Sequence, residues 1–154
     1  MIKNWRKQER KNMVILIDTN VILDFLMVRE EYYKNARDIL SLCADGKIKG
    51  YIAFHTLPNA FFIMRKTYSL QQRREILNRL CDYVTVTSVS HDQVRHAILR
   101  NDFKDFEDCL QAECAKAINA NYIITRNILD FSQSDTKAVT PIEFLQNIFD
   151  ENDL

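Results

Sequence analysis

Residues 13 to 26 read MVILIDTNVILDFL, and this stretch decides the fold. The run from Met13 to Ile17 is short, continuous and rich in β-branched residues, which is typical of a central strand buried on both faces. The run ends at Asp18, and the residues TNVILDFL that follow predict a turn into a short helix. We therefore expect Asp18 at the carboxyl end of a buried strand.

Segments typical of strands and of helices alternate along the rest of the chain. Further strands are predicted where short runs are apolar or β-branched, at residues 51–54, 84–89 and 122–125. Helices are predicted between and after them, at residues 31–47, 55–68, 69–83, 90–99, 105–120 and 140–149. Repeated strand–helix units imply a parallel sheet with helices on both faces, which is an α/β fold with three layers, α/β/α.

Short polar signals mark several predicted helix ends. Ser69 with Gln72, and Ser90 with Gln93, have the spacing of a capping box, in which each side chain bonds to the other residue's backbone N–H. The helix predicted at residues 31–47 stops near Gly46.

The composition fits one domain and excludes several nucleotide-binding loops. The chain has 154 residues, of which 47% are hydrophobic and 27% are charged, so it is long enough to bury a core. Its only glycines are Gly46 and Gly50. Loops that hold phosphate through backbone N–H groups need several glycines close together, so a Walker loop and a dinucleotide-binding turn are both excluded. A functional site must be built from side chains.

Charge is unevenly distributed along the chain. Lys plus Arg and Asp plus Glu each total 21, but residues 1–12 carry five basic residues and one acidic residue. We expect a basic N-terminal arm at residues 1–12, a folded domain at residues 13–149 with an acidic surplus, and an acidic tail at residues 150–154.

The cysteine spacing and the hydropathy predict a cytoplasmic protein. The four cysteines show no C-x-x-C spacing, which favours a reducing compartment. No apolar run approaches the roughly 18 residues that span a bilayer, so no membrane insertion is expected.

Carboxylates follow strands or begin helices at three separate places. Asp18 ends the first strand, Asp105 and Asp108 lie in the first turn of a helix, and Asp130 follows the strand at residues 122–125. The carboxyl ends of parallel strands meet at one edge of a sheet, where these charges repel one another unless a cation joins them. Mg²⁺ or Mn²⁺ prefers such oxygen ligands and supports phosphodiester hydrolysis. Helix capping alone also explains an aspartate at each position.

Three segments, in this order and spacing, resemble the PIN domain family of VapC-type toxin ribonucleases: VILIDTNVILDFL, DFEDCLQAECAKA and ANYIITRNILDF. The resemblance covers residues 13–149. It implies a small α/β/α sandwich that cleaves RNA as a Mg²⁺- or Mn²⁺-dependent endonuclease. It also implies an antitoxin partner and a homodimer.

The resemblance also assigns residues. Asp18 matches the family's first metal-binding aspartate, and Asp108 matches the aspartate that opens the late helix. Thr125 matches the hydroxyl residue that follows the next strand, and Asn20 matches the polar residue that often supports the first aspartate. We expect Asp18, Asp108 and Asp130 to hold the metal and carry catalysis, with Asp105 in support.

Two positions depart from the family pattern. Asn59 stands where many PIN nucleases have a glutamate, and Asn127 stands where an aspartate is common two residues after Thr125. Asn offers a neutral carbonyl ligand, so each replacement removes one negative charge. Asp130 supplies a charge if its loop folds back. The alternative function is a weakened PIN module that binds RNA or a protein without cleaving.

Two further readings stay open. The densest basic cluster of the folded region, a candidate contact for RNA phosphates or simply a solvated helix face, comprises Arg65, Lys66, Arg73 and Arg74. A phosphatase of the haloacid-dehalogenase type would also use Asp18, but its motif needs an acid two residues later, where this chain has Asn20.

Overall fold

A five-stranded parallel sheet organises the computed structural model, which describes residues 12–149. The strand order is β3-β2-β1-β4-β5. The strands are β1 (Val14–Ile17), β2 (Lys49–Ala53), β3 (Thr85–Thr87), β4 (Tyr122–Ile124) and β5 (Ala138–Val139). Except for Asn12, the expected basic arm at residues 1–12 lies outside the described residues, as does the expected tail at residues 150–154.

Strand β1 is the centre of the sheet, as predicted. Leu16 pairs with Tyr51 of β2 on one side and with Ile123 of β4 on the other. Ile15, Leu16 and Ile17 are 0% exposed. Because β1 is covered on both faces and both edges, the position of Asp18 directly after it is rigidly defined.

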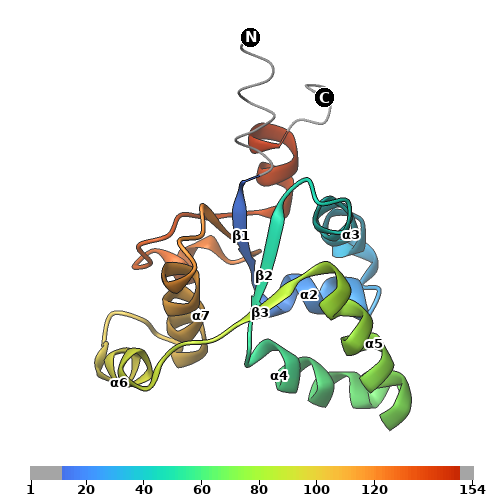
Figure 1. Ribbon diagram of the computed structural model, residues 1–154, viewed down its shortest axis with the longest axis horizontal. Coiled ribbons are helices and arrows are strands. Elements are labelled where there is room, and N and C mark those ends of the chain that lie inside the picture. Colours follow the sequence, from blue (N-terminus) through green and yellow to red (C-terminus); the bar gives the residue numbers. More distant parts are fainter. Residues whose placement is uncertain (1–11, 150–154) are drawn as a thin grey trace.

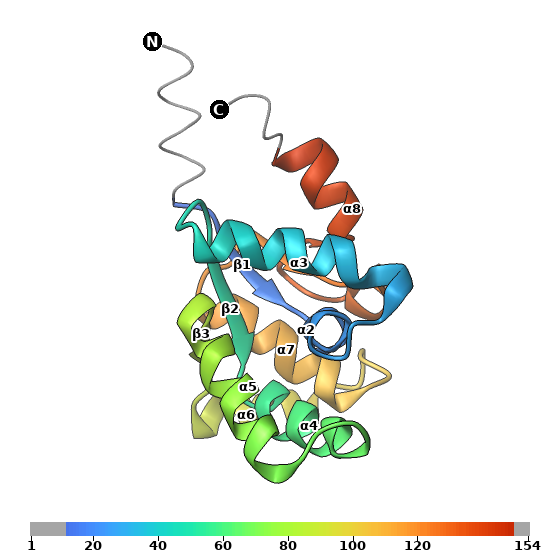
Figure 2. The same ribbon diagram turned by 90° about the vertical axis from the view of Figure 1, so that its right-hand side faces the viewer.

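Helices cover both faces of the sheet, which confirms the three-layer α/β/α fold. They are α2 (Thr19–Leu26), α3 (Glu30–Ala44), α4 (Thr56–Ile63), α5 (Leu70–Tyr83), α6 (His91–Leu99), α7 (Phe106–Ala117) and α8 (Pro141–Glu143). Helices α6 and α7 lie on one side of the sheet, and α2, α3 and α5 lie on the other (Figure 1). The view turned by 90° shows α3 and α5 in front of β1 and β2, with α7 behind (Figure 2).

The two faces have separate cores. The larger core lies under α2, α3 and α5 and includes Ile15, Ile17 and Ile39. The smaller core, under α7, joins Leu16 and Ile123 of the sheet to small residues of the helix. The small side chains of α7, Ala112, Cys114 and Ala115, bring this helix close to the sheet.

The predicted capping boxes are both present. Ser69 caps α5 and Ser90 caps α6, with reciprocal bonds to Gln72 and Gln93. Gly46, just after α3, has a φ of +65°, so it ends that helix in a left-handed conformation, as its sequence position predicts.

Some element boundaries differ from the prediction. The segment at residues 55–68 splits into α4 and a 3₁₀ turn, Met64–Lys66. The final segment divides into α8 and a wider π turn, Phe144–Ile148. The predicted strand at residues 84–89 is only Thr85–Thr87, and the two-residue β5 has no periodicity that a sequence pattern could reveal.

Candidate active site

Asp18 lies at the carboxyl end of β1 and is buried, with 3% of its surface exposed. Its backbone N–H donates to the carbonyl of Ile124 in the neighbouring β4. Asp18 is the N-cap residue of α2, but its side chain makes no capping hydrogen bond. Gln111 Nε2 donates to Asp18 Oδ1 at 2.7 Å, and Thr125 Oγ1 donates to Oδ2 at 2.8 Å. The carboxylate is therefore held toward α7 and β4.

Burial and hydrogen bonding act on the Asp18 carboxyl in opposite directions. Burial raises its pKa because the charged form loses water, and the bonds from Thr125 and Gln111 lower it because they favour the charged form. Burial prevails, and the pKa of Asp18 lies above its ordinary value. A cation at this carboxylate would stabilise its charged form.

The two aspartates at the start of α7 have different roles. Asp105 is the N-cap: its Oδ1 accepts hydrogen bonds from the backbone N–H groups of Glu107 at 2.7 Å and Asp108 at 3.4 Å. This is the capping alternative, and it applies to Asp105 alone. Asp108 is partly buried, and its pKa is raised to about 7, first by burial and then by the carboxylates of Asp18, Asp105, Asp130 and Glu107.

These side chains meet in one cavity of about 480 Å³, which we call the acidic cleft. The sequence-predicted residues that line it are Asp18, Asn20, Asn59, Asp105, Asp108, Asn127 and Asp130. Thr125 lies behind it, fully buried, where its hydroxyl donates to Asp18 and accepts the backbone N–H of Asn127 at 3.1 Å. The loop after β4 thus brings Asp130 to the same cleft as Asp18 and Asp108.

Glu107 is an acid of the cleft that the sequence analysis missed. Its Oε1 accepts a hydrogen bond from Asn59 Nδ2 at 2.8 Å and lies 3.5 Å from Thr19 Oγ1. Asn59 is on α4, where the family pattern has a glutamate. In this chain α7 thus brings a carboxylate against the asparagine of α4. The sequence signal was the string DFED, in which Glu107 adjoins Asp108.

Gln111 was also missed, although it lies three residues after Asp108 on the same helix face. Besides bonding Asp18, its Nε2 donates to Thr19 Oγ1 at 3.4 Å. Its Oε1 is buried and, among residues 12–149, has no hydrogen-bond partner. Within the described residues, Gln111 Oε1 is therefore an unpaired acceptor in the wall of the cleft, on the side chain that also bonds Asp18.

The basic cluster lies beside the cleft, against α4. The guanidinium of Arg65 stacks 3.5 Å from the ring centroid of Phe62, and Phe62 lines the cleft. The guanidinium of Arg73 stacks 4.2 Å from the ring of Phe61 and donates to the Phe61 carbonyl at 2.9 Å. Lys66 and Arg74 are exposed. Arg65 is thus linked to the rim, whereas Arg73 joins α5 to α4.

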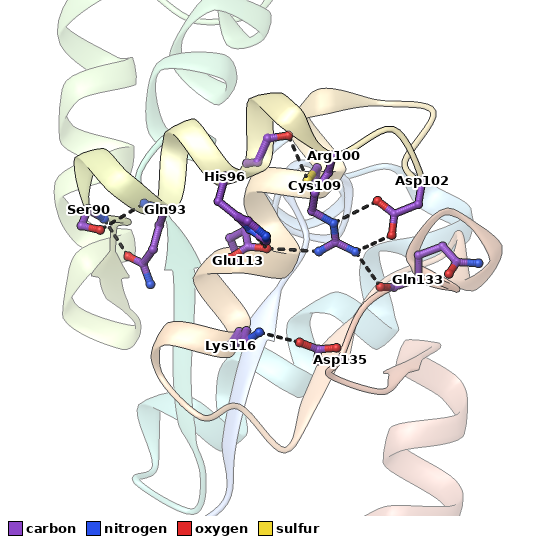
Figure 3. A network of polar contacts seen from close by, with 11 residues as sticks. Ser90, Gln93, His96, Arg100, Asp102, Cys109, Glu113, Lys116, Gln133 and Asp135 are labelled. Carbon is purple, nitrogen blue, oxygen red and sulfur yellow. Dashed lines mark hydrogen bonds and ion pairs between the residues drawn. The ribbon is translucent and has the colours of Figure 1, made fainter.

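A second group of charges, which we call the Arg100 cluster, joins the end of α6 and the loop after it to α7 (Figure 3). Arg100 binds Asp102 at 2.7 Å and Glu113 at 3.1 Å, and it donates to the Gln133 carbonyl at 3.0 Å. His96 Nδ1 lies 3.5 Å from Glu113. Arg100 therefore ties the loop before α7 to the segment after Phe131.

The donor chemistry of the acidic cleft fits a hard divalent cation. Asp18 and Asp108 offer carboxylate oxygens, and neither Lys nor Arg is among the described residues that line the cleft. Within residues 12–149, no three His, Cys, Asp or Glu side chains form a ready-made metal cluster. Mg²⁺ is commonly bound through one or two carboxylates and keeps its remaining ligands as water, so a preformed triad is not required.

In the part of the chain that the structure describes, no helix has both the length and the apolar character needed to cross a membrane.

Comparisons with known proteins agree on the fold. The sequence model of a family described as PIN domain matches residues 14–129. The structure resembles VapBC2 from Rickettsia felis, with 19% identity, a TM-score of 0.61 and coverage of 83% of this chain and 98% of that chain. It also resembles VapBC-1 from nontypeable Haemophilus influenzae, with 18% identity, a TM-score of 0.63 and coverage of 84% and 99%.

A third similar structure is VapC20 from Mycobacterium tuberculosis, described as a toxin that cleaves the sarcin–ricin loop. It is 16% identical, with a TM-score of 0.61 and coverage of 79% of this chain and 95% of that chain. At these identities the structural likeness shows the fold alone. Among curated proteins, the comparison found no match.

Proposed function

We propose a nuclease function for this chain, which belongs to the PIN domain family. In this proposal the protein is toxin-like and hydrolyses RNA phosphodiester bonds with Mg²⁺ or Mn²⁺. The observation that carries the proposal is the acidic cleft, where carboxylates from three separate segments face one another. The pKa of Asp108 is raised to about 7, first by burial and then by repulsion from these carboxylates. Such uncompensated carboxylates in a cleft are typical of a site that takes a cation.

Asp18 and Asp108 are the proposed metal ligands, with Asp130 or Asn127 completing the ligand set. When bound, the cation would lower the pKa of a bound water and stabilise oxyanions of the phosphodiester. The side chains of this protein hold the ligands in position. Thr125 and Gln111 fix both oxygens of Asp18, and each oxygen keeps a lone pair for another ligand.

Asn20 lines the cleft, where its amide can orient a water or the scissile phosphate. Glu107 supplies a negative charge on the wall where Asn59 supplies none. The Asn59 amide donates to Glu107 and so holds this carboxylate in place. Supporting groups of this kind typically change metal affinity or activity by about 10- to 100-fold. Asn59 therefore provides no acid itself, but it positions the carboxylate of Glu107.

The proposal includes RNA contacts and protein partners. Within the basic cluster, Arg65 is linked to the cleft because it stacks on Phe62, which lines the cleft. Lys66 and Arg74 are exposed and can reach RNA phosphates. Arg73 instead bonds to the carbonyl of Phe61. An antitoxin and a second copy of the chain are proposed partners on the resemblance to VapC-type toxins. The proposed setting is the cytoplasm, because all four cysteines are free.

The decisive experiment is the substitution Asp18→Asn, which removes a ligand charge without changing size. We expect Mn²⁺-dependent cleavage of single-stranded RNA to fall at least ~100-fold, consistent with the size of transition-state electrostatic terms. Circular dichroism should show an intact fold. The control is Asp82→Asn, at an exposed aspartate of α5, which should cleave like the wild type. If Asp18→Asn cleaves at the wild-type rate, the site assignment is wrong.

The alternative, a weakened module that binds without cleaving, is favoured by Asn59 and Asn127. A titration with Mn²⁺ followed by thermal unfolding separates the two functions. An intact site gives stabilisation that rises with Mn²⁺ concentration and is lost in Asp18→Asn. Binding of RNA with neither cleavage nor Mn²⁺ stabilisation would establish the weakened module.

A further inference from the structure

A second cavity, which we call the side pocket, adjoins the acidic cleft. It has a volume of about 300 Å³, at the lower end of the range of small-molecule sites, and it shares Asn127 with the cleft. Its walls come from α2, α3, the loop after β4 and the start of α8. The residues that line it include Asp24, Tyr32, Asn35, Arg126, Asn127 and Thr140.

The side pocket contains two flat groups suited to stacking. The guanidinium of Arg126 lies 4.0 Å from the ring centroid of Tyr32. Tyr32 is only partly buried, so part of its ring remains accessible. Bases stack on aromatic rings and on guanidinium planes, and this contact does not depend on which base is present.

Polar groups lie around the same space. The amide of Asn35 and the hydroxyl of Thr140 line the pocket. The Thr140 oxygen accepts the backbone N–H of Glu143, which leaves its O–H free to donate. An amide and a hydroxyl can bond to the edges of a base, whereas the stacked pair holds its face.

The wall of the side pocket contains a cationic side chain, Arg126, whereas no Lys or Arg is among the described residues that line the cleft. Asp24 is 1% exposed and is the anion for two guanidinium groups, Arg29 at 3.2 Å and Arg126 at 2.9 Å. Asp24 is thus shared between Arg29 and Arg126, and of these two guanidinium groups only that of Arg126 lines the side pocket. A phosphate next to the cleft would find its counter-charge here.

The acidic cleft also adjoins a third cavity of about 490 Å³, which shares Asp105, Asp108 and Asp130 with it. This cavity includes Lys104 in its wall. The acidic cleft thus shares lining residues with two other cavities, and Arg126 and Lys104 in their walls are cationic groups for the phosphates of an RNA strand.

We propose that the side pocket binds one nucleotide of a single-stranded RNA close to the scissile phosphate. The base stacks against the Tyr32–Arg126 pair, and its phosphate lies near Arg126. This inference rests on the proposed nuclease function and adds a base-binding subsite to it.

The test combines substitutions in the protein with abasic positions in the RNA. Oligoribonucleotides of eight residues carry one abasic ribose, placed at each position in turn, and fluorescence anisotropy measures their binding to full-length Asp18→Asn, which should not cleave them. In that background, Tyr32→Ala should weaken binding of the unmodified strand about 10-fold, in line with the loss of one stacked base. Tyr32→Phe keeps the ring and should bind within about 2-fold of its parent. Tyr83→Ala, at an exposed tyrosine of α5, is the matched control.

The decisive result is non-additivity at one RNA position. There, removal of the base should cost the parent protein about 10-fold in affinity and cost the Tyr32→Ala variant almost nothing. If the two losses add at every position, the side pocket binds no base. Wild-type cleavage of the unmodified strand with Mn²⁺ is measured in the same series. If the wild type cleaves RNA but the two losses of affinity add, only the proposal for the side pocket is rejected. If the losses do not add but the wild type does not cleave, only the proposed nuclease function is rejected.

Discussion

Helix α7 carries carboxylates into two regions that treat charge in opposite ways. In the Arg100 cluster, Glu113 and Asp102 both bind the same guanidinium, and this contact lowers the pKa of Asp102. In the acidic cleft, Asp108 faces other carboxylates, and its pKa is raised to about 7. An aspartate of the loop before α7 is thus favoured in its ionised form, whereas the aspartate in the first turn of α7 is favoured in its neutral form.

The two regions differ in whether the chain itself places a guanidinium against the carboxylates. Where the chain needs a fixed loop, it provides the cation itself, as Arg100. Where the described residues provide no cation at the cleft, we propose that the charge serves a cation from solution. Three changes test this contrast.

The largest effect on stability is expected from Arg100→Ala. Glu113 is 5% exposed, so the change leaves a buried carboxylate without its guanidinium. We expect unfolding free energy to fall by about 3 kcal/mol, as for other broken buried ion pairs. Urea denaturation measures it. Arg74→Ala, at an exposed arginine, serves as the control, and a loss no greater than the control's would mean that the cluster is not structural.

An intermediate effect is expected from Glu107→Gln. The glutamine keeps the size and can still accept the Asn59 hydrogen bond, but it removes one charge from the cleft. We expect Mn²⁺ affinity and RNA cleavage to fall about 10-fold, with little change in unfolding free energy. Isothermal titration with Mn²⁺ reports the first quantity. Glu75→Gln on α5 should change neither, and equal Mn²⁺ affinity in both variants would show that Glu107 lies outside the site.

The smallest effect is expected from Asp108→Asn, on the melting temperature measured without divalent ions. The pKa of Asp108 is higher in the folded chain, about 7, than its ordinary value of 3.8, so the folded state binds more protons between these values. Its contribution to stability therefore declines as pH rises from about 4 to about 7. The groups that face it are Asp18, Asp105, Asp130 and Glu107.

Asp108→Asn removes this decline. At pH 8 in EDTA we expect the variant to melt about 2–4 °C above the wild type, a small gain because Asp108 is partly exposed to water. At pH 4 the two melting temperatures should converge. Asp102→Asn should shift the melting temperature in the opposite direction, because Arg100 stabilises the ionised form of Asp102. A lower melting temperature for Asp108→Asn at pH 8 would contradict the contrast between the two regions.

Local patterns were sufficient to predict most of the fold. The buried run before Asp18 specified β1, and the caps at Ser69 and Ser90 specified the starts of α5 and α6, because each signal lies within a few residues. Strand β5 could not be predicted, since two residues carry no period. The π turn after α8 likewise has no sequence signal that we recognise.

The site was predictable only in part. Asp18 and Asp108 were predicted from their positions at the end of a strand and the start of a helix, and the structure brings both to the acidic cleft. The contacts of Glu107 with Asn59 and of Gln111 with Asp18 join residues 48 and 93 positions apart. Such pairs depend on how α4 and the sheet pack against α7, which no local pattern records.

The strand order has a consequence for the chain as it leaves the ribosome. Strand β1 is made first, yet one of its two neighbours, β4, begins more than a hundred residues later. A nascent chain shorter than this has Asp18 without Thr125 or Asp130, and its central strand has one open edge. The acidic cleft therefore forms only after Asp130 has been synthesised, when almost the whole domain has emerged.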